Sequence, residues 1–177
     1  MPTTNFPYGI GGPGQLQTVA TSPGTLPQTA NKTIFTITGG PILVEAIFGV
    51  VIPVIGGVAN ATKLQYLSAL SVADSLSAVD LCATADVNAL AKDAIYSIAG
   101  VLATGAIIVA PNVNQLALDQ ATRWNIMPGI IRINCAGSDG GTGIMQWYMR
   151  FRPYANFTIQ NPSPSSGIPV SLVTAAF

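Results

Sequence analysis

The sequence contains no histidine, and only 8% of its 177 residues are charged. The missing imidazole excludes Ser-His-Asp triads and Cys-His dyads, and it removes the commonest protein ligand of zinc and iron. Seven basic and seven acidic residues give a net charge of zero, which removes the repulsion that keeps copies of a protein apart. We therefore expect a structural or binding protein that associates with itself, with no catalytic residues, and not an enzyme.

Cysteine is scarce, and a secretory signal is not recognisable. Cys82 and Cys135 belong to no metal-binding spacing, so we interpret both as buried free thiols, with a disulfide between them as the alternative. Asp74, Asp80 and Asp86 lack the spacing of a calcium loop, and loop carboxylates are the simpler interpretation. We expect no metal and no cofactor. The amino terminus has neither a basic region nor an apolar core, which predicts synthesis in the cytoplasm.

The most apolar run, Thr33 to Val58, contains too many interruptions to form a membrane-spanning helix. Gly39-Gly40-Pro41, Glu45 and Pro53 all fall inside it, whereas a spanning helix needs about 20 largely apolar residues. Val, Ile, Phe and Thr dominate between these breaks and favour two or three β-strands. The run therefore predicts inner strands of a β-protein, and we expect no membrane partner.

Other stretches extend this prediction along the chain. Ile130 to Cys135 and Thr142 to Phe151 both read as strands, and the glycine-rich turn between them predicts a hairpin. Asp86 is placed to cap a short helix over Val87 to Ala91. We predict an all-β fold, a β-sandwich or jelly roll of about eight strands with one short helix and extended N- and C-terminal arms.

The domain boundaries follow from proline and glycine. Residues 1–32 hold five prolines and predict an extended N-terminal arm that lies on a neighbour or on its own domain. Residues 33–158 form the predicted sandwich. Residues 159–177 form a C-terminal tail whose last segment, SLVTAAF, is apolar enough to dock.

Candidate interaction residues come from the arm and from the few charges. Glu45 lies among apolar strand residues and needs a cationic partner, within the subunit or across a subunit contact. Its candidate partners are Arg132, Arg150 and Arg152. Arg150 and Arg152 share one face of their strand, and contacts with acids suit these dispersed arginines better than nucleic acid, for which a basic stripe is missing. The predicted interface residues are Phe6, Tyr8, Ile10, Glu45, Arg132, Arg150 and Arg152.

Three segments carry a resemblance to a known group of proteins: TIFTITGGPILVEAIFGVV, VDLCATADVNAL and GIIRINCAGSDGGTGIMQWYMRFRPY. Together they resemble small structural proteins encoded among the head genes of tailed bacteriophages. The resemblance implies a virion component on the capsid surface, made in the host cytoplasm. It further implies a decoration or cement protein that forms a homotrimer and bridges subunits of the major capsid protein.

One alternative stays open within the virion. It is a tail or fibre component, or a receptor-binding module for carbohydrate. The receptor-binding module would need an exposed aromatic platform near Trp124, Tyr148 or Tyr154.

Overall fold

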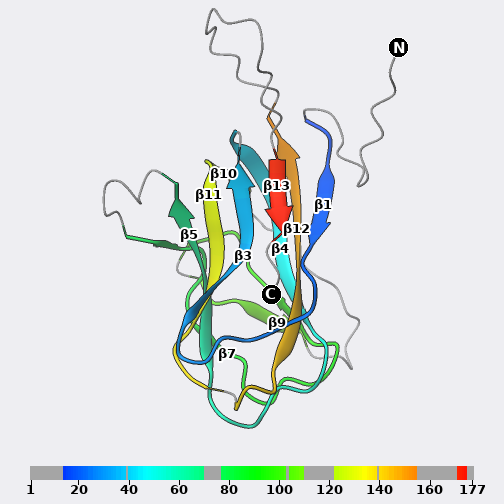
Figure 1. Ribbon diagram of the computed structural model, residues 1–177, viewed down its shortest axis with the longest axis vertical. Coiled ribbons are helices and arrows are strands. Elements are labelled where there is room, and N and C mark those ends of the chain that lie inside the picture. Colours follow the sequence, from blue (N-terminus) through cyan, green and yellow to red (C-terminus); the bar gives the residue numbers. More distant parts are fainter. Residues whose placement is uncertain are drawn as a thin grey trace, which may run out of the picture.

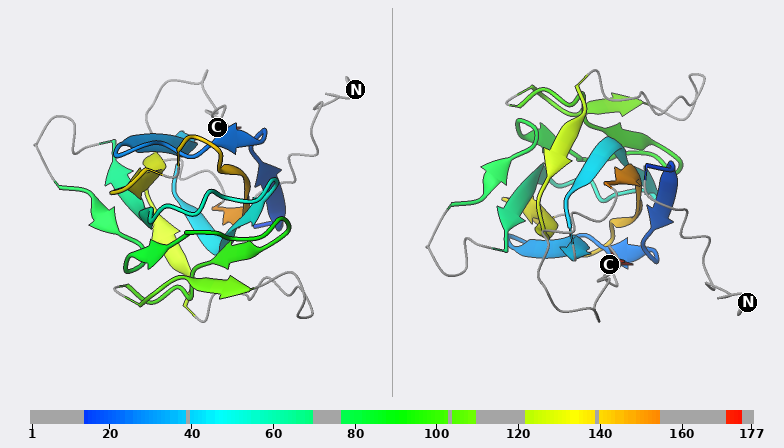
Figure 2. Two further views of the ribbon diagram at one scale, coloured as in Figure 1. Left: turned by 90° about the horizontal axis from the view of Figure 1, so that it is seen from below. Right: turned by 90° about the horizontal axis from the view of Figure 1, so that it is seen from above.

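The computed structural model describes residues 14–38, 40–69, 77–102, 104–109, 122–138, 140–154 and 171–174. These residues form two antiparallel sheets that pack face to face, and viewed along the long axis the strands of both sheets surround the core (Figures 1 and 2). The all-β, two-sheet fold expected from the sequence is confirmed. None of the described residues belongs to a helix capable of crossing a membrane.

The first sheet, sheet A, is built around two long neighbouring strands that pair along most of their length. Its strands, in spatial order, are β1 (Gln17–Ala20), β12 (Ile144–Pro153), β4 (Ile42–Val51), β8 (Ile95–Ser97) and β9 (Ile107–Val109). Two shorter strands extend it, since β2 (Gly24–Thr25) pairs with β12 and β10 (Trp124–Ile126) pairs with β4.

The second sheet, sheet B, contains the other strands. Its spatial order is β13 (Ser171–Thr174), β3 (Asn31–Thr38), β11 (Gly129–Cys135), β5 (Ala61–Ser68) and β6 (Val79–Asp80), with β7 (Ala85–Asp86) pairing with β5. Strand β3 lies in sheet B and the next strand in the chain, β4, lies in sheet A, so the chain passes from one sheet to the other between them.

The core lies between the sheets and is filled by alternating residues of the long strands. In β12, Met145, Trp147 and Met149 are fully buried, while the residues between them are half-buried on the outer face. Gly49 on β4 makes room for this layer, because a Cβ there would lie 2.7 Å from the methyl carbon of Met145 and 3.0 Å from the ring of Trp147. Both cysteines are buried and free, as expected.

The expected hairpin is wrong, although both of its strands exist. β11 pairs with β3 and β5 in sheet B, whereas β12 pairs with β1, β2 and β4 in sheet A. Each strand buries one face, so the two lie across the core from each other and the intervening loop crosses between the sheets. Loop composition alone does not distinguish a turn within one sheet from a crossing.

The short helix expected over Val87 to Ala91 is also wrong. Asn88 and Ala89 form a turn, and Ala89 has a positive φ of 52°. Asp86 does cap local N–H groups, but its Oδ1 accepts from Asn60 N at 2.9 Å and from Asn88 N at 3.0 Å. The carboxylate thus ties a tight turn to a neighbouring segment instead of starting a helix.

Both predicted terminal segments contribute strands to the domain. Strands β1 and β2 belong to the N-terminal segment and pair with β12. The second half of this segment therefore lies on the domain of its own chain. Residues 1–13, with Phe6, Tyr8 and Ile10, lie outside the described residues. Of the C-terminal tail, Ser171–Thr174 docks as β13 beside β3.

Candidate functional site at the base of the N-terminal segment

Glu45 occupies an irregular position in the middle of sheet A. Along the β4–β12 pair, Ala46 lies opposite Arg150 and Val44 lies opposite Phe151, which leaves Glu45 as the extra residue of a β-bulge. Val44 is buried in the core, so the bulge lets Glu45 face the outer side of the sheet toward β12. Glu45 is nevertheless only 6% exposed, which makes an ionic partner necessary.

Arg152, near the end of β12, supplies that partner. Its Nε donates a hydrogen bond to Glu45 Oε1 at 2.6 Å, and its Nη1 donates to the carbonyl oxygen of Gly14 at 3.0 Å. Gly14 N in turn donates to the carbonyl oxygen of Pro153 at 2.7 Å. The buried carboxylate therefore orients an arginine that fixes the position of residue 14, the first described residue of the chain.

Arg123, just before β10, is a second cation close to the Glu45 carboxylate. Its Nη1 is 3.8 Å from Glu45 Oε1, and its side chain is 60% exposed. The hydrogen bond from Arg152 is the main cause that lowers the pKa of Glu45, against its burial, and the positive charges of Arg152, Arg123 and Arg150 lower it further. We call Gly14, Glu45, Arg123 and Arg152 the Glu45 cluster.

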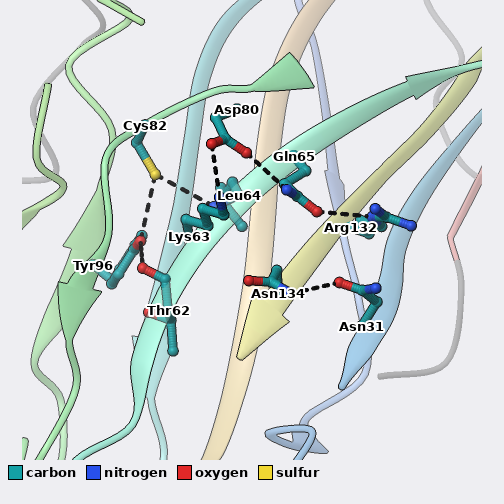
Figure 3. A network of polar contacts seen from close by, with 10 residues as sticks. All are labelled: Asn31, Thr62, Lys63, Leu64, Gln65, Asp80, Cys82, Tyr96, Arg132 and Asn134. Carbon is teal, nitrogen blue, oxygen red and sulfur yellow. Dashed lines mark hydrogen bonds and ion pairs between the residues drawn. The ribbon is translucent and has the colours of Figure 1, made fainter. Parts of the chain in front are cut away.

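A second polar group lies on sheet B (Figure 3). Asp80 Oδ2 accepts from Lys63 Nζ at 2.7 Å, and Asp80 Oδ1 accepts from Gln65 Nε2 at 2.7 Å. Gln65 Oε1 accepts in turn from Arg132 Nε at 3.0 Å. The two hydrogen bonds to Asp80 lower the pKa of its carboxyl. We call Lys63, Gln65, Asp80 and Arg132 the Asp80 network.

Cys82 and Tyr96 form a buried polar pair between the sheets. Cys82 Sγ lies 3.5 Å from Tyr96 Oη and accepts from Leu64 N, and burial raises the pKa of both the thiol and the phenol. A raised thiol pKa disfavours the nucleophilic thiolate. Within the described ranges, no three His, Cys, Asp or Glu side chains come together in a way that could hold a metal ion.

The aromatic side chains occupy different environments. Trp147 is buried and meets Tyr96 edge to face, with ring centroids 5.6 Å apart. Phe48 and Tyr148 are cross-strand neighbours on the outer face of sheet A, stacked at 5.0 Å with nearly parallel rings. Tyr154 is exposed at the end of β12, and its hydroxyl donates to Asn125 Oδ1.

The structure brings some of the predicted interface residues together and separates others. Of the three arginines considered as partners of Glu45, Arg152 forms the hydrogen bond and Arg150 adds charge nearby, whereas Arg132 belongs to the other sheet. Arg123 and Gly14 were missed. Their sequence surroundings carry no signal for this site, because it depends on the pairing of β10 with β4 and of residue 14 with the end of β12.

Comparisons with protein-family models, with curated proteins and with solved structures found no significant match.

Proposed function

We propose that the protein is a structural virion protein of a tailed phage, a decoration or cement protein that binds the assembled head lattice and stabilises it. The observation that carries this proposal is the link from Glu45 through Arg152 to Gly14. A sandwich that fixes the base of an apolar N-terminal segment is suited to holding that segment against a neighbouring surface.

The cementing mechanism needs no chemistry. A protein that binds only the assembled lattice stabilises it by mass action, since lattice opening must then release the bound protein. If three copies join, three weak contacts act together and the attachment gains avidity. The zero net charge fits such an assembly, because copies do not repel one another.

The N-terminal segment gives the direct test. Deletion of residues 1–13 leaves β1 and β2 in place, whereas a deletion through residue 30 would remove both. We expect the shortened protein to keep its fold and its unfolding midpoint, and to lose affinity for phage heads that lack their decoration protein. Binding is measured by co-sedimentation with the heads, and stability of the heads by their release of DNA on heating.

A matched variant separates the apolar contacts from simple chain length. Replacing Phe6, Tyr8 and Ile10 by serine keeps the length and should weaken binding nearly as much as the deletion. Equal binding by full-length and shortened chains would remove the N-terminal segment from the mechanism. Failure of the full-length protein to bind any head would overturn the cement function itself.

Carbohydrate recognition by a tail or receptor-binding module is the second candidate. The observation that favours it is the Phe48–Tyr148 pair on an outer sheet face, with Tyr148 Oη donating to Gln146 Oε1 at 2.9 Å. The stacking covers one face of each ring, which leaves less aromatic surface for a sugar than an open platform. Binding on a glycan array that is lost in Tyr148→Ala would favour this candidate over the first.

A further inference from the structure

Strand β13 completes the outer edge of sheet B. It pairs antiparallel with β3, with Ser171 opposite Thr38 and Thr174 opposite Phe35. The other side of β3 is occupied by β11. Without β13, this side of β3 would present unpaired N–H and C=O groups, and such edges are ready templates for another strand.

The composition of β3 offers little protection against pairing with another chain. Natural edge strands are commonly guarded by lysines or prolines. Lys32 is the one charged residue in Asn31–Thr38, and its Nζ donates to the carbonyl oxygen of Thr25 at 3.1 Å, within its own chain. The edge of β3 therefore accepts a strand on the basis of backbone hydrogen bonds and register.

The chain is long enough for β13 to reach a second copy. Positions 155 to 170 join Tyr154, at the end of β12, to Ser171. Sixteen residues span at most about 50 Å when extended, and a compact chain of this size has a radius of gyration of about 16 Å. Chain length thus permits β13 to pair with β3 of its own copy or with β3 of a neighbour.

We infer that, in the assembled protein, β13 is exchanged between copies: it completes sheet B of a neighbouring copy in the register it has in the single chain. Exchange around a closed ring leaves every β3 with one β13, so no strand pairing is lost. It ties the copies together by their own chains. The inference concerns how copies join and holds whether or not the assembled protein acts on phage heads.

The register provides a cross-linking test on the full chain. A tagged Thr38→Cys protein and an untagged Ser171→Cys protein are co-expressed and oxidised with glutathione disulfide. Cys82 and Cys135 are buried and stay out of the reaction. We expect a shift on a non-reducing gel to a disulfide-linked product of two different chains, which reduction abolishes.

The matched control replaces Ser171→Cys by Thr174→Cys. Thr174 lies opposite Phe35, three residues along β3 from Thr38, a displacement of about 10 Å, beyond the roughly 7 Å between Cα atoms that a disulfide tolerates. This pair should give no product of two chains if the exchanged strand keeps its register. Product from both pairs alike would indicate random collision and would overturn the inference.

The double variant Thr38→Cys/Ser171→Cys distinguishes exchange from pairing within one chain. Exchange predicts linked oligomers at the concentrations where sedimentation shows assembly. Linked monomers alone at those concentrations, together with no product from the mixed single variants, would show that each chain keeps its own β13.

Discussion

The Glu45 cluster and the Asp80 network are both ion-paired groups on the outer sides of the sheets, but they differ in burial. Glu45 is 6% exposed and sits in a bulge of sheet A, whereas the side chain of Asp80 is 44% exposed and its strand β6 lies at the edge of sheet B. Removing one partner of a buried pair leaves a charge without compensation, while an exposed charge is taken up by water. The same type of interaction should therefore matter much more in the first group.

The two groups also differ in what they connect. The Asp80 network joins neighbouring strands of one sheet, β6, β5 and β11. The Glu45 cluster joins β4 and β12 to residue 14 and to Arg123, which are distant in the chain. Loss of the first group should loosen one sheet edge, and loss of the second should release the base of the N-terminal segment.

The largest expected effect is that of Glu45→Gln. The amide can still accept one hydrogen bond, but Arg152, Arg123 and Arg150 then face one another without a carboxylate. Breaking a buried pair costs about 3–5 kcal/mol; because Arg152 is 40% exposed, we expect about 2 kcal/mol of the free energy of unfolding to be lost. Urea unfolding followed by tryptophan fluorescence measures it. A loss below that of Asp80→Asn would contradict the role assigned to burial.

The sequence made part of this site predictable. Glu45 is an acid inside an apolar run and therefore needs a cationic partner. The alternation of β12 places Arg150 and Arg152 together on one face. The choice of Arg152 was not accessible, because it depends on the register of β4 against β12 and on the bulge at Glu45. A shift of one residue at the bulge changes which side chain meets which arginine.

In the fold, too, single strands could be predicted from the local sequence, whereas their pairing could not. The buried alternation of β11 and the apolar run of β4 reflect local residue pattern, and both strands were predicted. Their partners were not, since the order of strands across a sheet depends on contacts between segments that are far apart in the chain. The glycine-rich loop after Cys135 therefore looked like a hairpin turn although it leads to the other sheet.

Lowering the pH should reduce the difference in unfolding free energy between the wild type and Glu45→Gln. The folded-state pKa of Glu45 lies below its ordinary value of 4.5, so its contribution to stability is fully present above that value and is lost as the pH falls through the folded-state pKa. We expect the difference in unfolding free energy between the two proteins to be constant from pH 7 to about pH 5 and to shrink below about pH 4. Urea titrations across this range test it, and a difference unchanged at pH 3 would mean that charge is not its source.

The next smaller effect is expected for Arg152→Lys. This variant tests whether the Glu45 cluster, unlike the Asp80 network, holds the base of the N-terminal segment. Lysine keeps a charge near Glu45 but cannot hold Glu45 and the Gly14 carbonyl with two fixed N–H donors. We expect a loss of about 1 kcal/mol in unfolding free energy and faster proteolytic cleavage near residue 14. Arg132→Lys is the matched control on sheet B, and it should leave cleavage near residue 14 unchanged.

The smallest effect is expected for Asp80→Asn. Asparagine keeps an oxygen that can accept from Gln65 Nε2, so the variant removes mainly the ion pair with Lys63. An ion pair of this exposure contributes about 0.5 kcal/mol, and in about 1 M salt screening over roughly 3 Å should remove most of it. The variant and the wild type should therefore have nearly equal urea midpoints in high salt. Glu45→Gln should stay destabilised there, because the Glu45 carboxylate is buried and solvent ions reach it poorly. If salt abolished both differences equally, burial would not be what separates the two groups.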